Sequence, residues 1–411
     1  MKDEILANQH DPTALETLYR SDKPAFKRSF NLLYPALQDN PLLGFWQARL
    51  NFAGTGPDLR RDLLFVIIAS LLAALVAKIP VIFQLDEENF FMRNVGFIVF
   101  PFLTAYFAWK KKLSSGKIIL VALVMIACAV YINLLPDVLK RDTTQLACIH
   151  LPLFLWCMLG FVFDNGKGQP GKRMSFLSYN GDLLVMTGLI LIAGGILTAI
   201  TINLFSMIGI QIEKIYFNYV IITGLSAAPL LGTYLVQSNP QLVGKVSPVI
   251  ARIFCPLVLV MLVIYLVAFV SRNTDPFNDR DFLLLINGLL IGVMAIIFFS
   301  IAEASRNEKH PAELWILLLL SAVTIIVNGI VLAAILFRIS SWGLTPNRLA
   351  VLGGNILILV NLLLVTRQLY LVVSKKKDAG EVGNSIAAYL PVYAAWAVIV
   401  TFIFPIIFGF R

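Results

Sequence analysis

The chain has 411 residues, of which 58% are hydrophobic and only 14% are charged, and this is far more apolar than an ordinary soluble domain. A net charge of +9 would suggest a nucleic-acid partner in a soluble protein, but here the basic residues border long apolar segments, where loop topology explains them. We therefore expect an all-α protein whose main partner is a lipid bilayer, and we exclude nucleic acid as a partner.

The first 60 residues are polar and form a segment of their own. Three short helices are predicted in it, because Asp11, Asp22 and Asn40 each stand one or two residues before a proline, a pattern typical of helix starts. The predicted second helix carries an apolar face around Phe26 and Phe30. This face either packs on its own neighbours or on the bilayer surface, or it docks a cytoplasmic protein partner.

Apolar stretches long enough to cross a hydrocarbon core, which takes roughly 17 to 25 helical residues, follow along the rest of the chain. We predict eleven spans, at residues 63–83, 90–109, 118–135, 145–163, 183–208, 216–236, 252–270, 282–302, 313–337, 348–373 and 386–408. Pro101 interrupts the second of them. The sequence therefore predicts a polytopic transmembrane helix bundle over residues 61–411, preceded by a small helical segment over residues 1–60.

Loop charges indicate the orientation, because Lys and Arg concentrate in short cytoplasmic loops. With the N-terminus inside, the cytoplasmic loops carry the basic groups at 110–117, 167–173, 245, 306–309 and 375–377, and the opposite loops carry the acidic groups at 86–88, 137–142 and 275–281. We therefore predict an inner-membrane protein with a cytoplasmic N-terminus and an extracytoplasmic C-terminus.

Small residues at intervals of three or four mark helix contacts in membranes. Such stripes comprise Gly194, Thr198 and Thr201 in the fifth span, Gly224, Ala228 and Gly232 in the sixth, and Gly288 and Gly292 in the eighth. We predict contacts within the molecule at these stripes, with a dimer interface as the alternative.

Polar side chains within the spans are the candidates for a binding site, because each is costly in lipid and needs a partner or a purpose. Those in the outer half of the predicted spans are Lys78, Asn133, His150, Asn203, Asn218, Asn287 and Asn355, while Asn328 and Asn361 lie nearer the middle. Each has a structural explanation, since asparagines bond across helices and a lysine near a helix end extends to the headgroups. Their shared depth motivates the hypothesis of a polar pocket that opens to the extracytoplasmic side.

Two outer loops could form the mouth of this pocket, and an acidic pair lies in another outer loop. Their candidate residues are Asp86, Glu87, Asp275, Asp279, Arg280, Asp281, Trp342 and Arg348. The carboxylates do not have the spacing of a calcium loop, so Asp279 or Asp281 is expected to cap the next helix. The four cysteines lack CxxC spacing and histidine partners, so no disulfide, metal site or cofactor is predicted.

The segment Trp342-Gly343-Leu344-Thr345-Pro346-Asn347-Arg348, followed by Gly354-Asn355, and the segment Asp275-Pro276-Phe277-Asn278-Asp279-Arg280-Asp281 carry a resemblance. Together they resemble an uncharacterised family of bacterial multi-pass inner-membrane proteins, a domain of unknown function. The resemblance implies a polytopic fold over the membrane portion and no established activity.

Three functions remain open from the sequence. A transporter or permease that binds a lipid or a small polar ligand suits the spans and the buried polar groups, although no phosphate-binding GxxxxGK[ST] loop is present and Glu303 and Glu313 lie only at cytoplasmic span ends. A membrane enzyme acting on a lipid-linked substrate could use Asp86 and Glu87. A sensor or scaffold could use residues 1–60 to bind a cytoplasmic protein.

Overall fold

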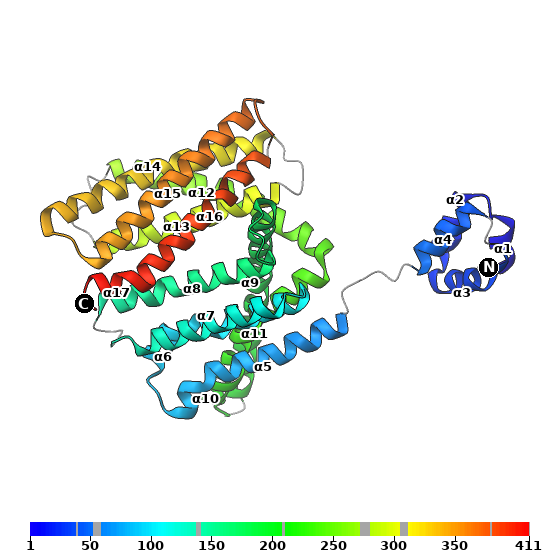
Figure 1. Cartoon of the computed structure of the whole chain (residues 1–411), viewed down its shortest axis with the longest axis horizontal. Helices are drawn as coiled ribbons and strands as arrows, with labels where there is room; N and C mark the ends of the chain where they lie inside the picture. The colour runs from blue at the N-terminus through cyan, green and yellow to red at the C-terminus, as the bar shows by residue number, and fades with distance from the viewer. Residues whose placement is uncertain are drawn as a thin grey trace. The chain divides into compact units, whose positions relative to one another are not determined.

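The computed structural model describes residues 1–37, 40–51, 59–136, 141–207, 210–271, 280–304, 311–378 and 380–410. Every regular element in these ranges is a helix (Figure 1). The chain divides into two compact units, Met1–Asp62 and Leu63–Arg411.

Short helices, some of them with side-chain caps, build the N-terminal unit. They are α1 (Lys2–Ala7), α2 (Pro12–Ser21), α3 (Lys23–Leu33), the 3₁₀ turn η1 (Tyr34–Ala36) and α4 (Pro41–Asn51). The Asp11 carboxylate accepts hydrogen bonds from two backbone N–H groups of α2, and Asp22 accepts one from α3, as expected for N-caps. The three predicted helices are confirmed, and α1 is additional.

The predicted apolar face of α3 lies inside this unit. Phe26 and Phe30 are fully buried and pack with Leu15, Leu43 and Trp46. The face therefore packs on its own neighbours, and Phe26 and Phe30 are not surfaces for a partner.

The second unit contains the apolar helices. They are α5 (Leu59–Phe83), α6 (Glu87–Lys110), α7 (Ser115–Leu134), α8 (Asp142–Phe163), α9 (Pro170–Met207), α10 (Glu213–Tyr216), the π-helix η3 (Phe217–Ile221), α11 (Ile222–Ser238), α12 (Pro240–Ser271), α13 (Arg280–Ala304), α14 (Pro311–Trp342), α15 (Pro346–Val373), α16 (Gly380–Val398), the π-helix η4 (Ile399–Ile403) and α17 (Phe404–Ile407).

Ten helical segments in the described residues are long and apolar enough to cross a membrane, and the shorter apolar stretch Arg252–Val267 lies within α12. Each of the eleven predicted spans therefore falls on a helix, and the protein is a multi-pass membrane protein. Pro101 does not divide the second span, because α6 is continuous through it. Several helices extend beyond the predicted spans. For example, α9 begins at Pro170, before the predicted span 183–208, because a helix can continue into polar residues outside the hydrocarbon.

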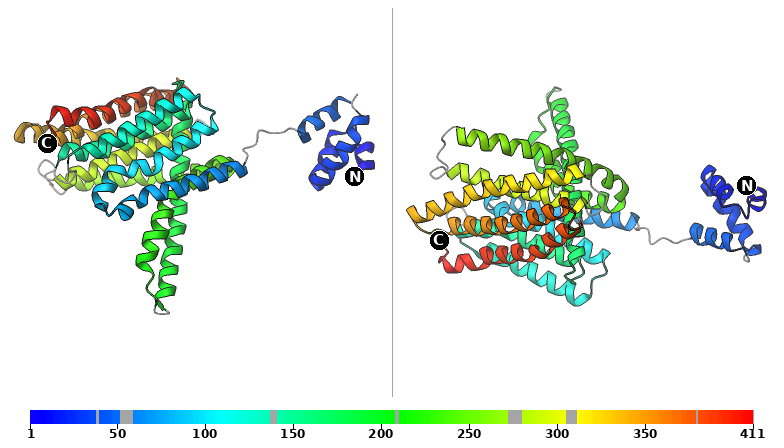
Figure 2. Two further views of the ribbon diagram at one scale, coloured as in Figure 1. Left: turned by 60° about the horizontal axis from the view of Figure 1, so that its bottom comes forward. Right: turned by 90° about the horizontal axis from the view of Figure 1, so that it is seen from above.

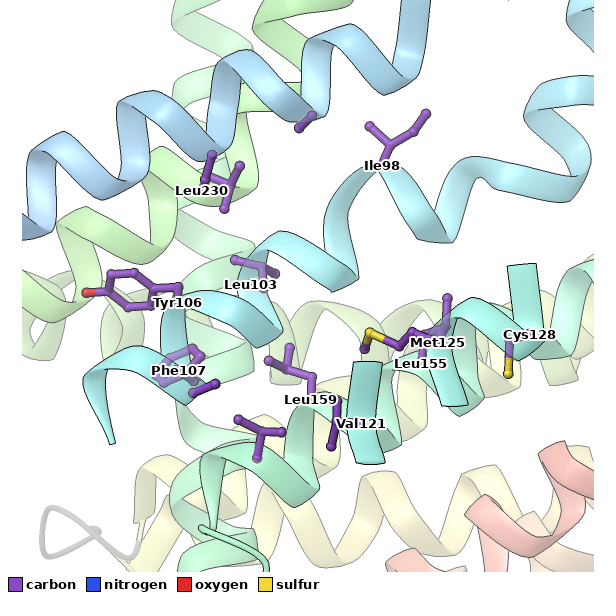
Figure 3. Close-up of a cluster of buried hydrophobic side chains, with 14 of the residues drawn as sticks. Ile98, Leu103, Tyr106, Phe107, Val121, Met125, Cys128, Leu155, Leu159 and Leu230 are labelled. Carbon is purple, nitrogen blue, oxygen red and sulfur yellow. The ribbon is translucent and has the colours of Figure 1, made fainter. Parts of the chain in front are cut away.

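Two buried apolar clusters hold the membrane unit together. The first contains residues of α5, α6, α7 and α8 and of parts of α9 and α11. Figure 3 shows Tyr106, Phe107, Leu155 and Leu159 within it. The second contains residues of all five helices from α12 through α16 and of the start of α9. Large apolar side chains on the outside, such as Leu123 in α7, are exposed, as expected of a surface that faces lipid.

The small-residue stripes only partly mark helix contacts. Gly232 meets α9, because a Cβ atom there would lie 2.6 Å from Thr187 Oγ1. Gly194, Gly224, Gly288 and Gly292 have open space where a side chain would begin, so the predicted contacts within the molecule are wrong at these four positions. The close contacts come from glycines outside the stripes. A Cβ atom on Gly181 would lie 1.7 Å from Phe299 Cδ2, and one on Gly353 would lie 2.1 Å from Trp396 Cη2.

A helical hairpin of α9 and α11 crosses the other helices of the membrane unit at a steep angle and projects beyond them (Figure 2). Its outer part is poorly covered, since Ile192, Ile196, Leu204 and Ile215 are all exposed. The predicted fifth and sixth spans are thus helices, but they do not run alongside the others.

Candidate functional site

The polar residues of the membrane unit lie in separate contacts between helices. Near the N-terminal end of α6, the side chains of Asn94 and Asn133 exchange two hydrogen bonds of 3.0 and 2.8 Å between α6 and α7. Each amide also donates to a carbonyl of its own helix, at Phe90 or Ala129. Asn133, a predicted site residue, therefore has all its donors satisfied by structural contacts.

Arg93 lies beside this pair and was not predicted as a site residue. The residue is 8% exposed, and its guanidinium donates to the carbonyls of Ile132, Leu135 and Pro136 at 2.6 to 2.9 Å. These are carbonyls at the end of α7 that have no partner within the helix, and a cation also suits the negative end of the helix dipole. Arg93 thus caps α7, and a charge only three residues inside the predicted span 90–109 was the signal for it.

A chain of three asparagines connects α13, α15 and α14. Asn355 Nδ2 donates to Asn287 Oδ1 at 2.6 Å, and Asn328 Nδ2 donates to Asn355 Oδ1 at 3.2 Å. Asn355 is 2% exposed and Asn328 is fully buried. No hydrogen bond from a described residue reaches Asn328 Oδ1, which is buried. We call Asn287, Asn355 and Asn328 the asparagine chain.

The asparagine chain lies near the middle of the membrane unit. Asn355 is nine residues from the start of α15, which is about 14 Å at the rise of an α-helix, or about half the thickness of a hydrocarbon core. Asn361 lies about 9 Å further along α15 and donates to Tyr393 Oη at 3.0 Å. It is also buried, and its Oδ1 accepts no hydrogen bond from a described residue. The polar groups therefore continue inward from the predicted outer half.

Lys78 occupies a different contact, between α5 and the π-helix η3. Its Nζ atom lies 3.9 Å from the centre of the Tyr219 ring, is buried, and donates no hydrogen bond to a described residue. Asn218 precedes Tyr219 and is half-buried. A cation over a tyrosine ring is stabilised by the ring's negative face, so Lys78 does not extend to the headgroups as its position near a helix end suggested.

His150 and Asn203 bond only within their own helices in the described contacts. His150 Nδ1 lies 2.9 Å from Leu146 O, and Asn203 Nδ2 donates to Ala199 O at 2.7 Å. Asn203 is exposed on the projecting part of α9. The structure therefore does not bring these two residues together with the other candidates.

Two of the candidate loop residues, Asp86 and Arg348, bond the ends of helices. Asp86 is the N-cap of α6 and accepts from Glu88 N at 3.1 Å, with Glu87 in the first turn. Asp275 and Asp279 lie outside the described residues, and Arg280 and Asp281 begin α13 with side chains that are likewise outside the description.

Trp342 and Arg348 meet at the turn between α14 and α15. Arg348 Nη1 donates to the carbonyls of Trp342 and Gly343 at 2.8 and 2.6 Å, and the guanidinium groups of Arg338 and Arg348 lie 5.1 and 5.7 Å from the Trp342 ring. Thr345 Oγ1 caps α15 by accepting from Arg348 N, as its position before Pro346 predicted. Arg348 thus caps the C-terminal end of α14, as Arg93 caps the C-terminal end of α7.

Buried carboxylates are found at the span ends assigned to the cytoplasm. Asp182 and Glu303 are 2% and 4% exposed, and Glu313 pairs with Arg252 at 2.9 Å. Across the described ranges, no group of three or more His, Cys, Asp and Glu residues could hold a metal ion. A comparison with known protein families, with curated proteins and with solved structures finds no match.

Proposed function

We propose that this membrane protein carries a small uncharged polar solute across the bilayer, and that the asparagine chain binds the solute. The observation that carries this proposal is Asn328 Oδ1, an acceptor that is buried in the membrane unit with no donor from the described residues. An unsatisfied buried polar group costs roughly 1 to 3 kcal/mol, and a ligand hydroxyl or amide that donates to it removes this cost.

The chemistry of the asparagine chain supports an uncharged solute. All hydrogen bonds of Asn287, Asn355 and Asn328 within the described residues are with amides and backbone carbonyls. The asparagine chain therefore has no formal charge to stabilise an ion that leaves water. Asn361 and Tyr393 offer a second set of polar groups about 9 Å further along α15. Two successive polar sites across the core suit a transport path better than a single catalytic centre.

Orientation is part of the proposal. Entry from the extracytoplasmic side is supported by Asn287, which lies seven residues from the start of α13 and follows an acidic loop. The basic loops support an inner-membrane location with a cytoplasmic N-terminus.

The side on which the C-terminus lies does not depend on the hairpin of α9 and α11. Its two helices either both cross the membrane or both do not, so they change the number of crossings by two or by zero. We expect a phosphatase fused to the C-terminus to be active outside the cytoplasm, and activity of a fused reporter only inside would refute this orientation.

Solute entry into proteoliposomes tests the proposed activity. Stopped-flow light scattering follows swelling in glycerol, urea or a monosaccharide, with acetate as a charged comparison. We expect the protein to accelerate entry of at least one uncharged probe, and Asn328→Leu to slow that entry about tenfold, since the loss of a hydrogen bond worth roughly 1.4 kcal/mol is tenfold.

The matched control is Asn203→Leu, which removes the same amide from an exposed position on α9. It is expected to leave entry unchanged. No acceleration over protein-free vesicles for any probe, or equal rates for Asn328→Leu and the wild type, would refute the proposal.

A further inference from the structure

Cationic side chains gather around the loop between α8 and α9, residues 164–169, which we call the glycine loop. Asn165, Gly166 and Gly168 have positive φ angles of 56°, 67° and 69°. Lys117 of α7 donates to Asn165 O at 2.6 Å. A Cβ atom at Gly168 would lie 3.5 Å from Arg173 Nη2, so α9 brings a guanidinium to the same loop.

The turn between α6 and α7 adds further cations. Lys110 Nζ donates to Tyr106 Oη at 2.9 Å, and Lys111 Nζ lies 5.2 Å from the centre of the Phe163 ring at the end of α8. Burial, and then the positive charges of Lys172 and Lys110, lower the pKa of Lys111. The turn and the start of α9 therefore lie close enough for their charges to repel.

No described carboxylate lies within ion-pair distance of four of these charges. Lys111, Lys117, Lys172 and Arg173, which we call the cationic cluster, form no ion pair within the described residues. Loop topology explains why lysines stand on this side of a membrane, but it does not explain why three helices hold them together. Like charges held close without a counterion are destabilising, and a bound anion would reverse the sign of that interaction.

Among the described hydrogen bonds, the glycine loop leaves one backbone N–H group free for an anion. Its carboxylate, Asp164, is buried and closes the loop by accepting from Gln169 N at 2.9 Å. The backbone N–H of Gly168 donates to no described atom, and the Arg173 guanidinium lies beside this residue, on the side where a Cβ atom would stand. Free backbone N–H groups in left-handed turns, together with lysine and arginine, are the groups that hold phosphate in proteins.

We propose that the cationic cluster and the glycine loop bind a phosphate-bearing anion. With the basic loops on the cytoplasmic side, it is either the headgroup of an acidic phospholipid in the inner leaflet or a soluble phosphate. This site is independent of the asparagine chain, whose residues lie on other helices and carry no charge.

Lipid retention by the full chain tests the site. The protein is placed in phosphatidylcholine nanodiscs with and without phosphatidylglycerol, and native mass spectrometry and thermal unfolding are recorded. We expect the wild type to retain phosphatidylglycerol and to unfold at a higher temperature with it. The double variant Lys111→Gln with Lys172→Gln should bind phosphatidylglycerol at least about tenfold more weakly. Each lysine near an anionic lipid raises the affinity by a factor of roughly five.

The control variant Lys375→Gln with Lys376→Gln removes the same charge from the loop between α15 and α16, which does not contact the glycine loop in the described hydrogen bonds. Without phosphatidylglycerol, Lys111→Gln should unfold at a higher temperature than the wild type, because the repulsion is relieved.

Inorganic phosphate distinguishes the two sources. Stabilisation of the wild type by phosphate in phosphatidylcholine alone identifies a soluble ligand, and stabilisation by phosphatidylglycerol alone identifies a lipid headgroup. The proposal is overturned when neither stabilises the wild type, when the double variant at Lys111 and Lys172 retains as much phosphatidylglycerol as the wild type, or when the control loses as much.

Discussion

Arg93 offers a test of how one side chain ends a membrane helix. Arg93→Met keeps the apolar stem but removes three hydrogen bonds to the carbonyls of Ile132, Leu135 and Pro136. Charge-assisted bonds contribute roughly 1.5 to 3 kcal/mol each, but carbonyls at a helix end regain water in part. We therefore expect the free energy of unfolding to fall by about 3 to 5 kcal/mol, as for the loss of one partner in a buried charged network.

Reversible unfolding in mixed micelles of a mild detergent and dodecyl sulfate measures this change. A fluorogenic maleimide reports unfolding, because Cys128, Cys148 and Cys255 are buried in the folded chain. Arg93→Lys keeps the charge, but a lysine lacks the planar guanidinium that reaches three carbonyls. We therefore expect a smaller loss of unfolding free energy than for Arg93→Met. Arg348→Met, which removes bonds to two carbonyls at a more exposed turn, should cost only about 1 kcal/mol. Equal losses for Arg93→Met and Arg348→Met would refute the reasoning.

Three further predictions concern contacts between helices. Alanine substitution of Asn94 and Asn133, singly and together, should give a coupling energy of about 0.6 to 1.7 kcal/mol in a double-mutant cycle of unfolding, and additive losses would contradict the reciprocal pair. Gly181→Ala should lower the unfolding free energy by about 1 to 3 kcal/mol, and Phe299→Leu in the same chain should recover part of it, because the new Cβ meets the Phe299 ring. Arg20 and Arg49 hold the pKa of Glu16 below its ordinary value, so their stabilisation of the N-terminal unit is present above pH 4.5 and is lost as the pH falls through the lowered pKa. Hydrogen exchange in α2 and α4 of the full chain should show this loss, and Glu16→Gln should abolish the pH dependence.

The spans and helix starts could be predicted because both depend on local sequence. An apolar stretch of sufficient length has no stable alternative to a helix in lipid, and Asp11, Asp22 and Thr345 cap the helices that they precede. Predictions that needed knowledge of neighbouring helices did less well. Gly288 and Gly292 have the spacing of a contact stripe but open surroundings, whereas isolated glycines meet aromatic rings.

The partners of polar residues could not be predicted for the same reason. Asn133 bonds with Asn94, which is 39 residues earlier in the chain, and Asn355 bonds with Asn287, which is 68 residues earlier. No local pattern relates residues that far apart. A single sequence gives the depth of each polar side chain through its place in a span, and depth alone groups residues that belong to different contacts.

Satisfaction of hydrogen bonds separates these candidates where depth does not. Asn133 has its amide donors and its acceptor bonded within the protein, so a ligand there would have to break existing bonds and would gain little. Asn328 Oδ1 and Asn361 Oδ1 are buried and accept no hydrogen bond from the described part of the chain, so a donor from a ligand gains the full value of the bond. In a membrane interior no lipid group can supply that donor. Binding of a polar solute at these acceptors of α14 and α15 would therefore lower the free energy more than binding at Asn133.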